Sequence, residues 1–248
     1  MNFLSFLRSV EDLLYELSLW VALVPKTFVK VLFQPAWSVT YVAAESEKEA
    51  AERYDGYMPP VIFWVLVSVI PNLLAVSSVV RFKAAKLPSQ SPGFLELLVS
   101  QSLEARFLAV AAFMLSGPLG FSLATLVARR QVVGRSSLQK GFYTQCYCFG
   151  VAYLFLLPAA ALLILVPPPG TMAVLSEKSP PFYITYLVSA NLFSLWIFYA
   201  ETNVLRRQMG CGWLKAIGIF VVFLIAAFLL MVVMEFVILI ALLGLVAK

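Results

Sequence analysis

The sequence predicts an all-α integral membrane protein, a bundle of five transmembrane helices preceded by short interfacial amphipathic helices. Three observations predict this fold class. Of the 248 residues, 62% are hydrophobic and 12% are charged, whereas soluble domains are nearer half apolar and a quarter charged. Apolar runs near spanning length recur along the chain, and Lys and Arg concentrate on one side of them. We divide the chain into a cytoplasmic and interfacial region, residues 1–59, and a transmembrane domain, residues 60–248.

The N-terminal region begins with apolar residues that recur every three or four positions from Phe3 to Val21, which predicts an amphipathic helix. Pro25 is expected to end this helix, and a second short helix is expected over Lys26–Phe33. Both are expected to lie along the membrane–water interface. The acidic residues of the first helix make packing against protein at least as good an explanation as docking on lipid. The following segment, Ala43–Tyr54, is expected to be a solvated helix with an acidic face.

Five apolar runs are predicted to cross the membrane. The first four match a hydrocarbon core of about 30 Å at a rise of about 1.5 Å per residue. The last is longer than a bilayer requires, so we expect it to tilt or to extend beyond the hydrocarbon. The runs are Pro60–Val80, Phe107–Ala128, Gln145–Val166, Phe182–Leu205 and Leu214–Ala247.

The basic residues predict the orientation of this bundle. Twelve of the eighteen Lys and Arg residues fall in the segments on the N-terminal side of the membrane, and six fall on the other side or at the C-terminus. Cytoplasmic loops carry the excess of positive charge. The N-terminus is therefore expected in the cytoplasm and the C-terminus on the opposite side, in the plasma (inner) membrane if the protein is bacterial. The net charge of +5 determines topology and does not indicate nucleic-acid binding.

Three polar residues inside the predicted spans are candidates for function. Asn72 follows Pro71, and this pair marks either a locally repaired kink or a broken helix that lines a substrate path. Glu201 lies near the cytoplasmic end of the fourth span and is expected to pair with the arginines that follow it. Glu235 lies within the last span, either at the far interface or truly inside the membrane. Ionisable residues inside a membrane are functional candidates.

Small residues repeat every four positions along the second span, beside a Gly-Pro pair. Such spacing lets another helix approach closely. We call these positions the small-residue seam, and we expect a packing surface, either within the chain or between subunits. The seam consists of Ser116, Gly120, Ala124 and Ala128.

The sequence gives no support for an enzyme. It contains no histidine, which excludes a His base, a His-containing triad and a His metal site. Its three cysteines, Cys146, Cys148 and Cys211, are too few for a Cys₄ zinc site. Phosphate-binding and nucleophile motifs are also missing. We therefore expect no catalytic, metal-binding or cofactor-binding residues.

The layout resembles the Yip1-domain superfamily of small five-span membrane proteins, in its bacterial type. The resemblance covers about residues 26–248 and rests on short segments. The segment Lys26–Pro35 precedes the first span, Phe142–Tyr147 opens the third, and Gly212–Ala216 opens the fifth. The resemblance implies a non-enzymatic membrane protein with a cytoplasmic N-terminus. The acidic-aromatic motif of eukaryotic trafficking members has only a faint counterpart in Tyr54–Pro59, which argues against a trafficking role.

Two functions of different classes follow. The first is a scaffolding or membrane-organising protein of Yip1-like type, which packs against itself as a homo-oligomer or against a membrane-protein partner, with the lipid bilayer as its surroundings. The alternative is a transporter or channel component with a polar path near Asn72 and Glu235. A lipid-modifying enzyme ranks last, because the acidic segment before the first span has no histidine beside it.

Overall fold

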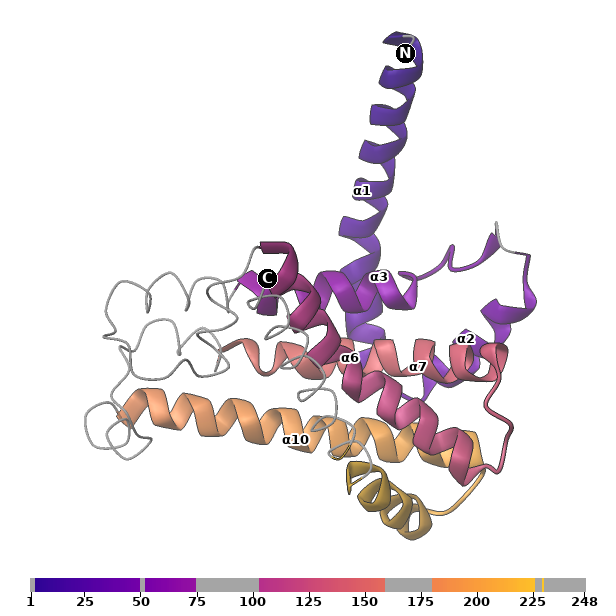
Figure 1. The fold of residues 1–248 in the computed structure, drawn as a ribbon, viewed down its shortest axis with the longest axis vertical. Helices are drawn as coiled ribbons and strands as arrows, with labels where there is room; N and C mark the ends of the chain where they lie inside the picture. Colours follow the sequence, from indigo (N-terminus) through magenta and orange to yellow (C-terminus); the bar gives the residue numbers. More distant parts are fainter. Residues whose placement is uncertain (1–2, 50–51, 75–102, 159–179, 226–228, 230–248) are drawn as a thin grey trace, which may run out of the picture.

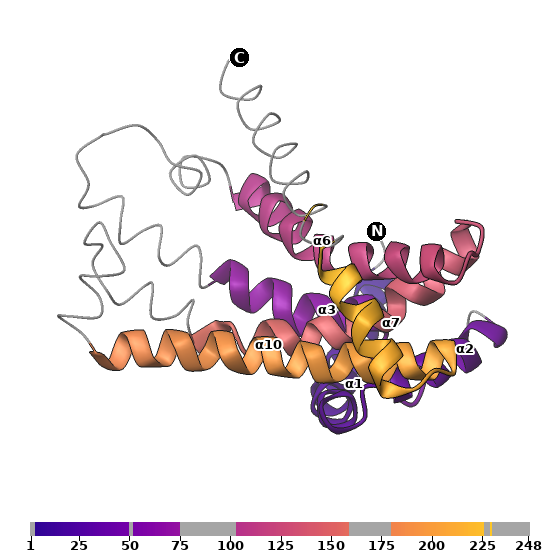
Figure 2. The same ribbon diagram turned by 90° about the horizontal axis from the view of Figure 1, so that it is seen from below.

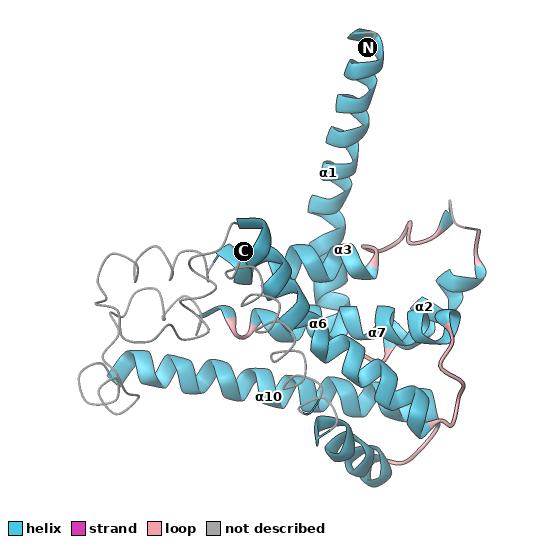
Figure 3. Ribbon diagram, viewed as in Figure 1, coloured by secondary structure: helices cyan, strands magenta, loops and turns pink. Residues whose placement is uncertain are grey.

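The computed structural model describes residues 3–49, 52–74, 103–158, 180–225 and 229. Every regular element in these ranges is a helix and none is a strand, which confirms the all-α class (Figure 3). Figure 1 shows how the helices are arranged: α10 and α7 lie side by side, α6 crosses α7, and α1 projects away from the others. In Figure 2, α1 is seen end-on while α10 runs across the view.

The first helix, α1, runs from Phe3 to Phe33 without a break, so the predicted break at Pro25 is wrong. Proline removes one backbone hydrogen bond and crowds the preceding turn, and packing on both sides of it offsets this cost. Val24 and Phe28 both pack on the core, and Val31 is fully buried. The Thr27 hydroxyl also accepts a 2.9 Å hydrogen bond from the Met58 backbone N–H. The two predicted N-terminal helices are therefore one.

The second helix, α2, covers Trp37–Glu47, so it begins and ends earlier in the chain than the predicted helix Ala43–Tyr54, and it is less solvated than predicted. Glu45, expected on an exposed acidic face, is 3% exposed. Its carboxylate accepts a hydrogen bond of 2.7 Å from Lys48 and one of 2.6 Å from the Tyr54 backbone N–H. Glu45 thus closes the loop after α2. Helical periodicity could not predict this burial, because the Glu45 carboxylate bonds to a backbone N–H that lies beyond its own helix.

The contacts of the Glu45 carboxylate with Lys48 and Tyr54 predict that the stability of the fold depends on pH. Burial alone would raise the pKa of Glu45, but the hydrogen bonds from Lys48 and Tyr54 and the Lys48 charge outweigh it and hold the pKa below its ordinary value of 4.5. A lowered pKa contributes stability above the pKa of the unfolded chain, and this contribution is lost as the pH falls through the folded pKa. We therefore expect the free energy of unfolding to decrease below about pH 4.5.

Denaturant unfolding in detergent between about pH 3 and pH 7 measures this effect, because it crosses the region where the Glu45 carboxylate gains a proton. Glu45→Gln should flatten the acid limb. Glu47→Gln is the matched control, because Glu47 lies on the same helix and is exposed. Equal flattening by both variants would contradict the role assigned to Glu45.

The first predicted span begins as α3, Pro60–Trp64, and continues through a π-helical turn, η2, Val65–Val69, into a helix that is described as far as Leu74. The wide π turn lies just before Pro71. In a regular α-helix the ring of Pro71 would crowd the carbonyl one turn earlier, and the wider turn makes room for it. This apolar helix, Pro60–Leu74, is shorter than a membrane span within its described length. The rest of the prediction, residues 75–80, lies outside the described residues.

The helices α6, Leu103–Ala128, and α7, Arg135–Leu154, pack closely against each other. Gly117 of α6 lies against the ring of Phe149, and Gly141 of α7 faces Ser122. α7 also contacts α1, α2, α3 and α10, so it is the central helix of the described fold. Its buried stretch, residues 144–153, begins one residue before the predicted start of the third span at Gln145. The described helix ends at Leu154, and residues 159–166 of that prediction lie outside the described residues.

An aromatic cluster joins α2, the loop before α3, and α3 itself to α7. Tyr147 is fully buried at its centre, and its hydroxyl donates a 2.6 Å hydrogen bond to the Met58 carbonyl. Edge and tilted ring contacts of this kind add to the burial energy of each ring. The rings that contact Tyr147 are those of Trp37, Tyr41 and Phe63.

The long helix α10 covers Pro180–Met209. Gly210 follows it with φ of +60°, the left-handed conformation that commonly ends a helix, and a further helix covers Trp213–Ile225. One described helix, Val110–Ala128, is long and apolar enough to cross a membrane. Two further segments are long and apolar enough only when taken together as one broken span, bent by 114° at the break: Leu187–Met209 and Trp213–Ile225. The described residues thus contain one or two candidate spans.

Candidate functional site: a buried amide–carboxylate pair beside a basic cavity

A polar contact joins the two neighbouring helices α7 and α10 in the interior. Gln145 Nε2 donates a 2.9 Å hydrogen bond to Glu201 Oε2. Gln145 is 1% exposed and Glu201 is 0% exposed. A buried carboxylate needs donors that compensate for lost hydration, and the Gln145 amide supplies one.

The pair keeps unused hydrogen-bonding capacity. Glu201 Oε1 and Gln145 Oε1 are both buried and have no hydrogen-bond partner among the described residues, and the same holds for Thr202 Oγ1. These atoms can accept hydrogen bonds, and a protonated Glu201 could also donate one. Buried polar atoms with free capacity are uncommon in folded proteins and mark places where a proton or a small donor could bind.

The arginines after Glu201 do not pair with it, so that expectation is wrong. The Arg206 guanidinium lies over the Trp213 ring, 4.4 Å from its centroid, and Arg207 is exposed. Within the described ranges, no ion pair links Glu201 to a basic residue. Helical geometry explains the difference, because Glu201 faces α7 while the arginines, five and six residues later in the same helix, lie on other faces. The partner, Gln145, is 56 positions away in the sequence, and no local pattern connects the two.

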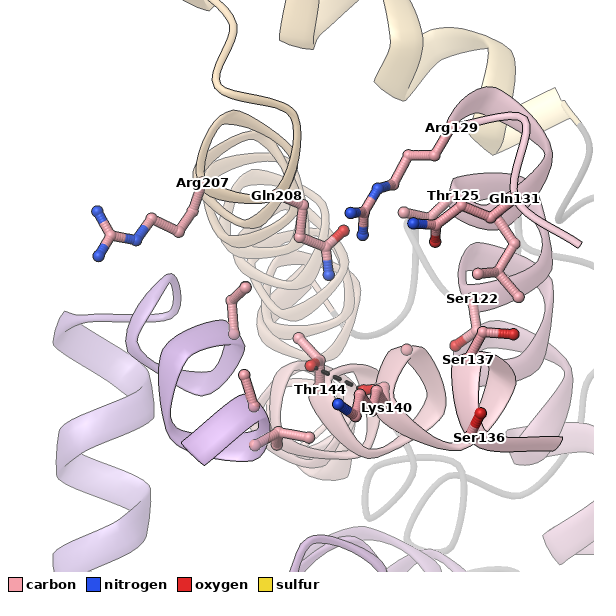
Figure 4. Close-up of a pocket in the computed structure, with 15 residues that line it drawn as sticks. Ser122, Thr125, Arg129, Gln131, Ser136, Ser137, Lys140, Thr144, Arg207 and Gln208 are labelled. Carbon is pink, nitrogen blue, oxygen red and sulfur yellow. Dashed lines mark hydrogen bonds between the residues drawn. The ribbon is translucent and has the colours of Figure 1, made fainter. Parts of the chain in front are cut away.

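A cavity of about 530 Å³ lies between the C-terminal ends of α6 and α10 and the N-terminal part of α7 (Figure 4). Helices α2, α6, α7 and α10 contribute to its walls. Thr144, which precedes Gln145, lines this cavity, so the buried pair lies close behind its wall. The lining residues are Val39, Val42, Ala43, Ser122, Thr125, Leu126, Arg129, Gln131, Ser136, Ser137, Lys140, Gly141, Thr144, Arg207 and Gln208.

The cavity is basic. The described residues that line it include Arg129, Lys140 and Arg207 and no Asp or Glu. None of these three cations has an ion-pair partner in the part of the chain that the structure describes. Figure 4 shows Arg129 extending toward Gln208, whereas Arg207 extends away from the middle of the cavity. In the sequence these cations indicate only membrane topology, and the cavity is not visible there because its residues come from four separate helices.

The other predicted site residues do not gather here. The Asn72 side chain donates a 2.9 Å hydrogen bond to the Ser68 carbonyl in its own helix, which fits the repaired kink. Of the small-residue seam, Ser116 and Gly120 are buried, Ala124 is half-buried and Ala128 is exposed. This mixed burial does not test whether the small-residue seam is a packing surface, which stays a prediction.

Two further predictions concern the last span and metal binding. Glu235 lies outside the described residues. Among residues that the structure does describe, no three His, Cys, Asp or Glu side chains lie close enough to hold a metal ion.

No protein family matches the chain, and no curated protein or solved structure is significantly similar to it. The resemblance to the Yip1-domain superfamily therefore stays a prediction that rests on the residues alone. The buried pair and the basic cavity must be interpreted from their own chemistry.

Proposed function

We propose that the chain is a non-enzymatic, multi-pass membrane protein of Yip1-like type that organises the membrane by packing against itself or a membrane-protein partner. One observation carries the proposal: large apolar side chains are exposed on α10 and on Trp213–Ile225, whereas polar groups such as Glu201 are buried. So many exposed large apolar side chains on neighbouring helices favour a surface that lipid or protein covers. The exposed residues include Ile184, Leu187, Val188, Leu192, Leu195, Leu214, Val221, Val222 and Ile225.

The proposed orientation has support from the cavity. Arg129, just after α6, and Arg207, in the last turn of α10, line the same cavity. The C-terminal ends of these two helices therefore lie at one end of the bundle, as the charge count requires of two cytoplasmic ends. In this proposal, the cytoplasmic N-terminus lies on the same side and the C-terminus on the other.

Assembly is tested on the exposed face of α10. The double variant Leu192→Ala/Leu195→Ala is expected to stay in the membrane but to lose its partner subunits, because helix association in lipid depends on close packing. Native mass in nanodiscs should then fall to one chain of 27.5 kDa. Val132→Ala, in an exposed loop position, is the control.

These outcomes separate the two parts of the proposal. Release of the wild-type chain from membranes by alkaline carbonate would contradict integral membrane insertion. A wild-type mass of a single chain, with no co-purified partner, would contradict scaffolding by assembly. Gly120→Leu is a less direct test of assembly, because Gly120 is buried within the chain.

A second candidate function, a transporter or channel component, has its own observation in the Gln145–Glu201 pair. A buried carboxylate with a free oxygen is the kind of group that carries protons or cations across a membrane. Reconstituted protein would then show proton or cation flux in proteoliposomes, and Glu201→Gln would reduce it. Absence of flux across a broad panel of ions and solutes would exclude transport by this chain alone.

A further inference from the structure

The basic cavity has an excess of hydrogen-bond donors. The hydroxyls of Ser122, Thr125 and Thr144 already donate to backbone carbonyls of their own helices. The donors that remain are the charged groups of Arg129 and Lys140, together with side-chain amides and the Ser136 hydroxyl. Cations without a counter-charge, gathered around one space, favour an anionic ligand.

The arrangement fits a phosphate better than a single carboxylate. Arginine offers a planar pair of donors to phosphate oxygens, and lysine adds a point charge. Ser136 lies in the first turn of α7, whose N-terminus carries partial positive charge. A volume of about 530 Å³ is large enough for a phosphate and the group esterified to it.

Part of the cavity lining is apolar. Val39 and Val42 of α2 and Leu126 of α6 contribute to it. A ligand with a phosphate at one end and hydrocarbon at the other would contact both kinds of lining. We propose that this cavity binds a phosphate group, presented by an anionic phospholipid headgroup or by a free phosphate compound; its apolar lining favours the lipid. The cavity forms within one chain, so this proposal does not depend on assembly.

Thermal unfolding of the full chain in a neutral detergent tests the proposal. The probes are inorganic phosphate, dihexanoyl phosphatidylglycerol and, as a control without phosphate, dihexanoyl glycerol. A ligand that binds only the folded state raises the melting temperature as its concentration increases. We expect dihexanoyl phosphatidylglycerol to stabilise the chain, dihexanoyl glycerol to have no effect, and added salt to weaken the stabilisation.

Two variants link the effect to the cavity. Arg129→Gln and Lys140→Gln are each expected to weaken binding by about tenfold or more, because each removes a charge-assisted hydrogen bond. Both side chains are exposed, so neither change should disturb folding. Arg130→Gln is the matched control, because Arg130 is the next residue, is also exposed and does not line the cavity.

Each outcome has a defined meaning. Stabilisation by phosphatidylglycerol but not by inorganic phosphate would identify a lipid site, and stabilisation by both would identify a site for free phosphate compounds. Stabilisation by neither would overturn the proposal. Equal losses in Arg129→Gln and Arg130→Gln would also overturn it, because the effect would then reflect overall charge.

Discussion

Gln145→Leu is expected to lower the free energy of unfolding by roughly 2–4 kcal/mol. Leucine has a similar size but removes the only hydrogen bond that the Glu201 carboxylate receives among the described residues. Glu201 is fully buried and cannot recover this bond from bulk water. Denaturant titration in detergent, followed by circular dichroism, measures the loss.

Two companion variants separate this mechanism from a packing defect. Glu201→Gln keeps a hydrogen-bonding side chain and should be close to neutral, since its amide could donate to the free Gln145 Oε1. The double variant Gln145→Leu/Glu201→Leu removes both polar groups and should be more stable than Gln145→Leu alone. A double variant that shows the sum of two large losses would contradict an electrostatic role for the pair.

Gly117→Ala is expected to destabilise the α6–α7 contact by about 1–3 kcal/mol. A Cβ atom at Gly117 would lie 2.5 Å from Cε1 and 2.8 Å from Cδ1 of the Phe149 ring. Phe149 is only 4% exposed and packs against Phe121 and Tyr153, so its ring has little space to move. The helix propensity of alanine, worth up to about 1 kcal/mol over glycine, offsets only part of this cost.

Gly218→Ala is the matched control. Gly218 also lies in a helix, Trp213–Ile225, but no other residue that the structure describes has an atom within 4 Å of the added Cβ. Here alanine should stabilise the chain by up to about 1 kcal/mol, because only the propensity difference acts. Measured in the same detergent titration, the two variants should shift the unfolding midpoint in opposite directions. A shift of the same sign would mean that the Gly117 contact does not limit packing.

The sequence predicted the helical class and the apolar part of α6, because composition and run length depend on residues that are close together in the chain. It did not predict that α1 continues through Pro25. Local rules assign a cost to proline, whereas the packing of Val24, Phe28 and Val31 that outweighs this cost comes from the rest of the fold.

The candidate site was harder to predict for the same reason. Glu201 was singled out as a polar residue in an apolar run, but its hydrogen-bond partner was not predicted, because the Gln145 contact joins two helices far apart in sequence. The basic cavity draws residues from four helices. No single segment of the sequence contains its pattern, so only tertiary structure reveals it.

The separation of Gln145 and Glu201 along the chain also has a consequence for biosynthesis. Synthesis proceeds at about 5–20 residues per second. Because Gln145 and Glu201 are 56 positions apart, the Gln145 amide precedes its acceptor by about 3–11 s. During that interval α7 can already pack on α1, α2, α3 and α6, while the face that will receive α10 still presents an unpaired polar group. Docking of α10 covers that group and completes the basic cavity. An exposed Gln145 amide in a nascent chain therefore indicates that α10 has not yet packed against α7.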